Sequence, residues 1–122
     1  MAEHTPTDIL LHQRSRVLEI AFNDGARFNL SCEYLRTHSP SAEVRGHGPG
    51  QGVLQTGKEA VNITGIEPVG NYAVKLVFDD GHDSGLYTWD YLYKLGHQFD
   101  HNWQTYLDAL AEAGYTRKPP VA

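Results

Sequence analysis

The chain has 122 residues, a formal net charge of −5, 40% hydrophobic residues and 20% charged residues. This length fits one domain around one core, and the composition is that of an ordinary globular protein. The acidic balance argues against a nucleic-acid partner, because neutralising phosphates requires a basic face and the ten Lys and Arg are scattered among fifteen Asp and Glu.

The N-terminal residues predict neither a signal peptide nor a membrane anchor. The stretch MAEHTPTD lacks a basic region followed by an apolar one, and no apolar run approaches the roughly 20 residues that a membrane span needs. We therefore expect a cytoplasmic protein with no membrane partner. Residues 1–8 are expected to be flexible, residues 9–114 to form the single domain, and residues 115–122 to form a flexible tail.

A strand, a tight turn, a second strand and a helix are predicted twice along the chain. Val17–Gly25 reads VLEIAFNDG and Ala73–Gly81 reads AVKLVFDDG. Both end in Asp-Gly, which lets a short turn reach positive φ between paired strands. Alternating apolar positions give each first strand one face suited to burial. Two such units packed together predict a small single-domain α+β fold of paired antiparallel β-hairpins with two or three helices.

Other elements are expected before and between these units. A first strand is predicted over Asp8–Gln13. Ser39 followed by Pro40 predicts a short helix that ends at Gly46, because serine caps a free N–H and proline suits the first helical position. The glycine-rich sequence that follows predicts a loop to about Thr56.

The C-terminal half is expected to contain one more strand and two helices. The strand runs from Ile63 to a turn at Pro68–Asn71. Helix boundaries follow from cap residues: Thr88 begins a helix that runs through Leu95 and ends at Gly96, and Asn102 begins a last helix that stops at Gly114.

Enzyme signatures are missing from the sequence. The single cysteine, Cys32, excludes an internal disulfide, and its neighbours favour a small buried side chain over a nucleophile. No G-x-S-x-G motif or H-x-D/E start of an iron site occurs. His82, Asp83 and Ser84 have the residue types of a hydrolytic triad, but three adjacent turn residues cannot adopt its geometry. We do not expect catalysis by this chain.

Three interpretations compete for the glycine-rich segment. A phosphate cradle would use backbone N–H groups with Arg45, but the glycines do not open a helix after a strand. A metal site would combine His47 with His82 or His38, although the histidines lack metal-ligand spacing. A partner-binding surface would use the open backbone together with Arg45 and His47, and this interpretation fits best.

The chain resembles the small bacterial DUF971 family, which is similar to the N-terminal domain of gamma-butyrobetaine hydroxylase. The resemblance rests on LRTHSPSAEVRGHGPGQ (Leu35–Gln51), FDDGHDSGLYTWDYLYKLG (Phe78–Gly96) and the FNDG turn, and it extends from about Leu10 to Leu110. It implies paired β-hairpins with helices. It also implies a domain found alone or fused to other modules, among them iron and 2-oxoglutarate-dependent hydroxylases and P-loop carriers of iron-sulfur clusters.

The resemblance implies that a zinc site has been lost. In the hydroxylases a C-x-C-x-x-C segment and a later histidine bind a structural zinc ion. The positions that match the cysteines are Ser39, Ser41 and Val44 here, and only His82 matches the histidine. Serine is a poor zinc ligand and valine is none, so no cofactor is expected. His82 is expected to lie close to the Ser39–Val44 turn and to hydrogen-bond it.

The sequence thus predicts a non-catalytic binding or adaptor module with an unknown protein partner. The alternative is an iron- or zinc-binding accessory protein, in iron-sulfur cluster handling, with His47 and His82 as candidate ligands. For the aromatic residues of the predicted surface, core packing remains the competing interpretation. The predicted surface comprises Arg36, Ser39, Ser41, Glu43, Arg45, His47, Gln51, His82, Ser84, Tyr87, Trp89 and Asp90.

Overall fold

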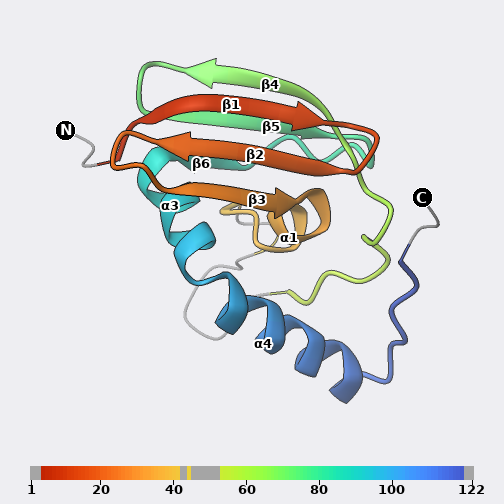
Figure 1. Ribbon diagram of the computed structural model, residues 1–122. Coiled ribbons are helices and arrows are strands. Elements are labelled where there is room, and N and C mark those ends of the chain that lie inside the picture. The colour runs from red at the N-terminus through yellow and green to blue at the C-terminus, as the bar shows by residue number, and fades with distance from the viewer. Residues whose placement is uncertain (1–3, 42–43, 45–52, 120–122) are drawn as a thin grey trace.

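The computed structural model describes residues 4–41, 44 and 53–119, and this part of the chain forms two three-stranded antiparallel sheets and three helices (Figure 1). The first sheet has the order β1 (Pro6–His12), β2 (Val17–Phe22), β3 (Arg27–Ser31), and α1 (Cys32–Thr37) follows it. The second sheet has the order β4 (Ile63–Val69), β5 (Ala73–Phe78), β6 (Leu86–Thr88), followed by α3 (Trp89–His97) and α4 (Phe99–Glu112). The predicted α+β fold of paired antiparallel hairpins is confirmed.

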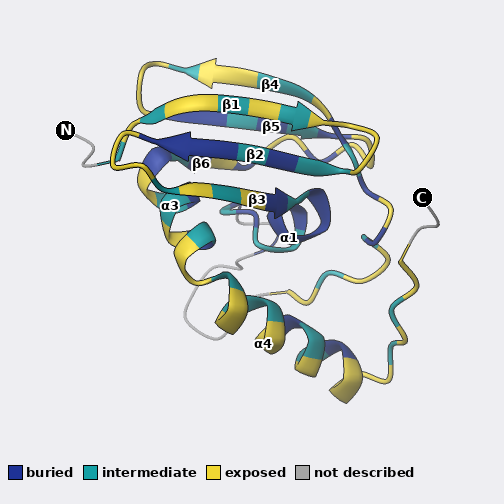
Figure 2. Ribbon diagram, viewed as in Figure 1, coloured by how far each residue is buried: buried dark blue, intermediate teal, exposed yellow. Residues whose placement is uncertain are grey.

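Both sheets contribute to one hydrophobic core. The middle strands β2 and β5 are the most buried, and Figure 2 shows β2 dark blue along most of its length. The alternation read from the sequence places their apolar residues inward, and removing these side chains from water is the main force that holds the two units together. The fully buried members include Leu18, Ile20, Leu30, Leu76 and Leu92, with Cys32 among them as expected.

The two predicted Asp-Gly corners have nearly the same backbone. Gly25 has φ 92° and Gly81 has φ 90°, a region that residues with a Cβ rarely adopt. In the first corner the Gly25 N–H donates to the Phe22 carbonyl at 3.0 Å, and in the second the Gly81 N–H donates to the Phe78 carbonyl at 3.1 Å. The internal repeat predicted from the sequence is therefore present in the structure.

Helices α1 and α3 each contact the other unit through residues at equivalent positions of the repeat. Ser31 caps α1 by accepting from the Tyr34 N–H, and Thr88 caps α3 by accepting from the Tyr91 N–H. The hydroxyl of Tyr34 donates to the Leu95 carbonyl near the end of α3 at 2.7 Å. The hydroxyl of Tyr91 donates to the carbonyl of the residue that follows α1, His38, at 2.6 Å. Each tyrosine thus satisfies a carbonyl that the opposite helix leaves unpaired at its end.

The same exchange occurs two residues further along each helix. Arg36 of α1 binds the corner residue Asp80 of the second unit, with Nε 2.8 Å from Oδ2. Tyr93 of α3 binds the corner residue Asp24 of the first unit, with its hydroxyl 2.7 Å from Oδ2. Each unit therefore holds the tight turn of the other. The fold is a pair of interlocked repeats.

Gly96 lies inside α3, so the predicted helix end at this residue is wrong. A Cβ on Gly96 would overlap the ring of Phe28 from β3, closer than 3.0 Å to three ring atoms. The glycine is present because strand and helix approach closely there, and the helix continues to His97. Thr88 is confirmed as the cap of α3.

Two further boundaries differ from the sequence-based expectation, and a third is confirmed. The last helix begins at Phe99, and Asn102 lies within it, where its amide donates to the Tyr34 hydroxyl at 3.1 Å. The strand β4 runs through Pro68 and turns at Gly70, because β4 is an edge strand whose outer side needs no N–H donor. The predicted stop at Gly114 is confirmed, with φ 76° just beyond α4.

Parts of both expected flexible ends are fixed in the fold. Residues 6–8 belong to β1, and the His4 ring stacks on Tyr93 with centroids 3.6 Å apart. After α4, the hydroxyl of Tyr115 and the N–H of Lys118 donate to the Glu59 carboxylate. Residues 4–8 and 115–118 therefore belong to the domain. No helix in the described ranges has the length and apolar character needed to cross a membrane.

We predict that Gly96→Ala lowers the free energy of unfolding by about 1–3 kcal/mol, because an added methyl in a packed site forces the Phe28 ring to move. Urea denaturation measures the change. The exposed helical variant Glu112→Ala serves as control and should stay within about 0.5 kcal/mol of wild type. Adding Phe28→Leu should make the double variant lose less than the sum of the single losses; additive losses would contradict the steric explanation.

Candidate functional site

The segment after α1 is fastened to the second Asp-Gly corner by two side-chain hydrogen bonds. Ser39 Oγ lies 2.9 Å from His82 Nε2, and both residues are buried. Ser41 Oγ lies 2.8 Å from Ser84 Oγ. These four residues are called the serine–histidine knot. The contact predicted between His82 and the Ser39–Val44 turn is confirmed.

Local backbone geometry shapes the knot. The Ser39 hydroxyl also accepts a hydrogen bond from the Ser41 N–H at 3.2 Å. This bond to the backbone two residues later stabilises a turn. Ser39, Pro40 and Ser41 are not helical, so the predicted start at Ser39 is wrong, whereas Val44, inside the predicted range, is helical. The predicted end of that helix, Gly46, and most of the expected glycine-rich loop lie outside the described residues.

Gly85 makes the close approach of the two segments possible. A Cβ at this position would overlap Ser39 Oγ and lie 3.3 Å from Cδ of Pro40. In the internal repeat, Gly85 corresponds to Phe28, because each follows an Asp-Gly corner. Ser39 likewise corresponds to Gly96. The close contact thus recurs in both halves with the small and the large residue exchanged.

Asp80 anchors the corner beneath the knot. Its Oδ1 accepts the His82 N–H at 3.1 Å, while Oδ2 accepts from Arg36 Nε at 2.8 Å and from Lys58 Nζ at 2.6 Å. Burial acts to raise the pKa of Asp80, but the hydrogen bonds from Lys58, the His82 backbone and Arg36 outweigh it and lower the pKa to about 2. Asp80 is therefore a charged, pre-formed support for the His82 backbone.

The aromatic residues of the predicted surface are structural. The Tyr87 hydroxyl donates to the Leu35 carbonyl of α1 at 2.6 Å, and burial raises the pKa of this phenol. The Trp89 indole N–H donates to the Asn71 carbonyl at 2.8 Å. Buried aromatic residues with a polar end commonly satisfy such carbonyls. The core-packing interpretation therefore holds for both residues.

The predicted binding face is not one exposed patch in the described part of the chain. Half of the predicted residues are buried because they join the two units, so they do not present a contact surface. These residues are Arg36, Ser39, Ser41, His82, Tyr87 and Trp89. Ser84 and Asp90 are exposed. The remaining predicted residues, Glu43, Arg45, His47 and Gln51, lie outside the described residues.

The Ser39–His82 hydrogen bond pairs the residue types of a nucleophile and a base. Ser39 is fully buried, and its hydroxyl is packed against Gly85. A nucleophile needs room for a reacting carbon about 3 Å away, and this site has none. The pair therefore holds structure and does not point to catalysis.

Sequence reasoning missed an apolar cleft between α1 and α4. It has a volume of about 370 Å³ and leads to two exposed apolar residues, Val53 and Leu54. The signal was present, because two adjacent apolar residues in a predicted loop have no core position to explain them. Its lining consists of Thr37, His38, Val44, Val53, Leu54, Gln55, Thr105, Tyr106 and Ala109.

Comparison with known proteins places this geometry in a family. The family described as gamma-butyrobetaine hydroxylase-like, N-terminal, matches residues 9–93. The chain belongs to this family. A protein solved by NMR in solution is 53% identical with a TM-score of 0.81, over 97% of this chain and 88% of that chain. Another NMR structure is 50% identical with a TM-score of 0.82, over 99% and 95%.

A crystal structure of a DUF971 family protein with unknown function, from Acidithiobacillus ferrooxidans, is also similar. It is 39% identical with a TM-score of 0.64, over 75% of this chain and 92% of that chain. The resemblance inferred from the two sequence runs is therefore confirmed. No curated protein matches the chain.

The positions that resemble the zinc ligands of the hydroxylases do converge in this family member, but their chemistry does not fit the metal. Ser39 and His82 are bonded to each other, and the Val44 N–H donates to the Ser41 carbonyl at 3.0 Å. One imidazole with two hydroxyls lacks the thiolate or imidazole set that zinc requires. Among the described residues, no three His, Cys, Asp or Glu side chains form a group that could hold a metal ion.

We predict that His82→Ala and Ser39→Ala each lower the free energy of unfolding by about 1–3 kcal/mol, because each removes the buried Ser39–His82 hydrogen bond. The double variant should lose clearly less than the sum of the two. Chemical denaturation gives all three values. His101→Ala, at an exposed position, is the matched control, and an equal loss there would argue against the knot.

The Asp80 pKa predicts a specific acid sensitivity. Because the folded-state pKa of about 2 lies below the ordinary 3.8, the stabilisation is fully present above pH 3.8 and is lost as the pH falls toward 2. Wild type should lose more stability than Asp80→Asn between neutral pH and pH 2, by at most about 2 kcal/mol because solvent screens part of the interaction. Asp83→Asn is the control at an exposed neighbour and should follow the wild-type curve.

Proposed function

We propose that this protein is a non-catalytic interaction module that binds an uncharged, apolar segment of a partner protein in the cleft between α1 and α4. The observation that supports it most is the exposure of Val53 and Leu54, 54% and 38%, beside a cleft of about 370 Å³. Burying one such side chain contributes about 1.5–3 kcal/mol to association. A contiguous apolar site of this kind favours a protein ligand.

The lining of the cleft defines the chemistry of the partner. It contains no Asp, Glu, Lys or Arg among the described residues. Its single titratable imidazole, His38, has a pKa lowered by burial, so it is uncharged at neutral pH. A charged segment would lose its hydration there without gaining a counter-charge, whereas an apolar segment loses nothing.

The cleft is also built on rigid elements. The Tyr106 side chain comes from α4, and Thr37 and His38 come from the end of α1, which Tyr91 holds in place. On the third side, the Val53 N–H donates to the Val44 carbonyl at 2.7 Å and fixes the backbone from which Val53 and Leu54 project. A preformed site binds with little ordering cost, which suits an adaptor.

The closed Ser–His pair also supports the proposal. The knot supplies a structural reason for a non-catalytic role, because its Ser–His pair is closed to substrate. The alternative of an iron- or zinc-binding accessory protein is not favoured by any cluster in the described ranges, and its candidate ligand His47 lies outside them.

The test is a charge introduced into the cleft. Val53→Asp/Leu54→Asp should abolish stoichiometric capture of a specific partner from the native cell extract and weaken its purified complex at least tenfold by calorimetry. Leu10→Asp, at an exposed apolar position on β1, is the control and should bind as wild type does. Equal binding by all three proteins, or occupation of the cleft by a second copy of the chain in sedimentation experiments, would contradict the proposal.

A further inference from the structure

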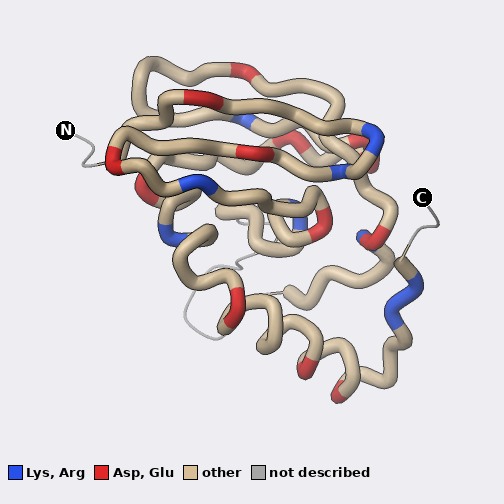
Figure 3. Tube along the Cα trace, viewed as in Figure 1, with Lys and Arg blue, Asp and Glu red and all other residues tan. Residues whose placement is uncertain are grey.

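A second cleft lies near the start of α1, between the turn that joins β1 to β2 and the C-terminal tail. It has a volume of about 270 Å³ and is distinct in residues from the apolar cleft. Figure 3 shows Lys and Arg segments at this turn and in the tail, at the same end of the molecule. The cleft is lined by Arg14, Ser15, Arg16, Ser31, Glu59 and Arg117, with Glu33 at its buried side.

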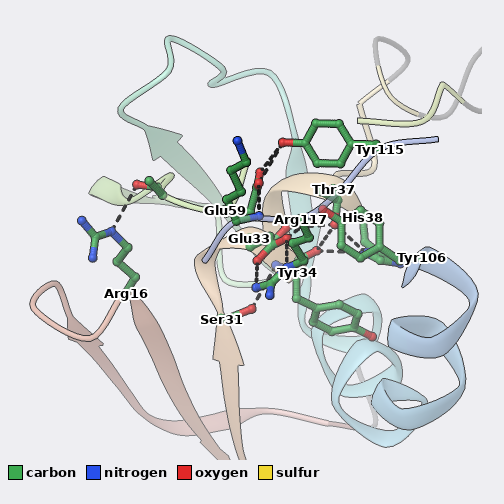
Figure 4. Close-up of polar contacts among 12 residues, drawn as sticks. Arg16, Ser31, Glu33, Tyr34, Thr37, His38, Glu59, Tyr106, Tyr115 and Arg117 are labelled. Carbon is green, nitrogen blue, oxygen red and sulfur yellow. Dashed lines mark hydrogen bonds and ion pairs between the residues drawn. The ribbon is translucent and has the colours of Figure 1, made fainter. Parts of the chain in front are cut away.

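The two carboxylates of this cleft are already engaged. Glu33 is 3% exposed and accepts from Arg117 through Nε at 2.7 Å and through Nη2, and from the Tyr106 hydroxyl at 2.8 Å. Glu59 accepts from the Tyr115 hydroxyl and the Lys118 N–H, both at 2.8 Å. Figure 4 shows these contacts crowded around Glu33 and Glu59. Their hydrogen-bonding capacity is largely used within the protein.

Two arginines of the same cleft have N–H donors that no described residue accepts. Arg16 uses only Nε, which donates to the Ala60 carbonyl at 3.1 Å, and Figure 4 shows this single contact. Arg14 makes no hydrogen bond or ion pair with any described residue. Both terminal nitrogens of the Arg16 guanidinium are likewise left without a partner in the described ranges. The Ala60 contact holds the guanidinium through Nε and leaves both terminal nitrogens available.

The backbone at Arg16 is unusual for a residue with a side chain. Its φ is 57°, and it is the one residue other than glycine with positive φ in the described part of the chain. Glycine or asparagine would adopt this conformation at lower cost. The Arg16 carbonyl accepts the Cys32 N–H at 2.9 Å, which ties the turn to the start of α1. An arginine kept in a strained turn, with its fork unused, favours a role for the side chain in binding.

The geometry points to a binding site for a small oxyanion, a carboxylate or phosphate group, clamped by Arg14 and Arg16 beside Arg117. A guanidinium fork matches two oxygens of either group. The lining has three arginines and two glutamates, which gives it one net positive charge and suits a singly charged group. The Ser15 hydroxyl adds a further donor in the lining. This site shares no lining residue with the apolar cleft, and its proposal does not rest on the partner proposed for that cleft.

The test is an NMR titration of the full chain with sodium phosphate and, separately, sodium acetate, each compared with sodium chloride at equal ionic strength. We expect the Arg16 side-chain Nε–H and the backbone amides of residues 14–16 to shift in a saturable way. The stronger of the two titrations distinguishes a phosphate from a carboxylate ligand. Shifts no larger than those produced by chloride would overturn the site.

Variants separate binding from folding. Arg16→Gly relieves the positive φ and removes the fork, so it should remain as stable as wild type while affinity falls at least tenfold. Arg14→Ala leaves the strained residue in place and should weaken binding as well. Arg27→Lys, on β3 and paired with Glu19, is the control and should leave the titration unchanged. Wild-type affinity in both Arg16→Gly and Arg14→Ala would overturn the proposal.

Discussion

The hydrogen bond between Ser39 and His82 is the constraint on which the arrangement of the two units depends. It joins the segment that leaves α1 to the corner that follows β5, and both partners are shielded from water. A buried polar pair specifies one arrangement, because any displacement leaves a donor or acceptor unsatisfied. Asp80 extends this specificity by holding the His82 backbone and the Arg36 side chain at once.

The reciprocal contacts explain why a short chain forms two stable sheets. Neither three-stranded sheet buries both its faces, and each completes its core against the other unit. The helix caps, the tyrosines three residues beyond them and the corner aspartates repeat in the two halves and bind across them. The Ser39–His82 hydrogen bond of the knot is not repeated at the first corner, where Phe28 packs against Gly96.

The two proposed binding sites lie near opposite ends of α1 and differ in the interactions that they offer a ligand. The apolar cleft offers uncharged, apolar surface, so its affinity for a partner comes from removing the Val53 and Leu54 side chains from water. The arginine-lined cleft offers unused donors from Arg14 and Arg16, and the Arg16 guanidinium is held by its bond to the Ala60 carbonyl. Both rest on α1, the shortest of the three described helices, which is locked at its start by Ser31 and at its end by Tyr91.

The sequence by itself determined the elements and the repeat, because Asp-Gly turns, alternating apolar residues and the Thr88 cap act over a few neighbouring residues. It also predicted the His82 contact, through the resemblance of the two motif runs. Only the tertiary structure decided which polar and aromatic residues are buried, since Ser39, Tyr87 and Arg36 meet partners more than forty residues away. Local sequence carries no record of such long-range partners. For the same reason Gly96 reads as a helix end until the Phe28 ring is seen against it, and the two clefts emerge only when separate segments assemble.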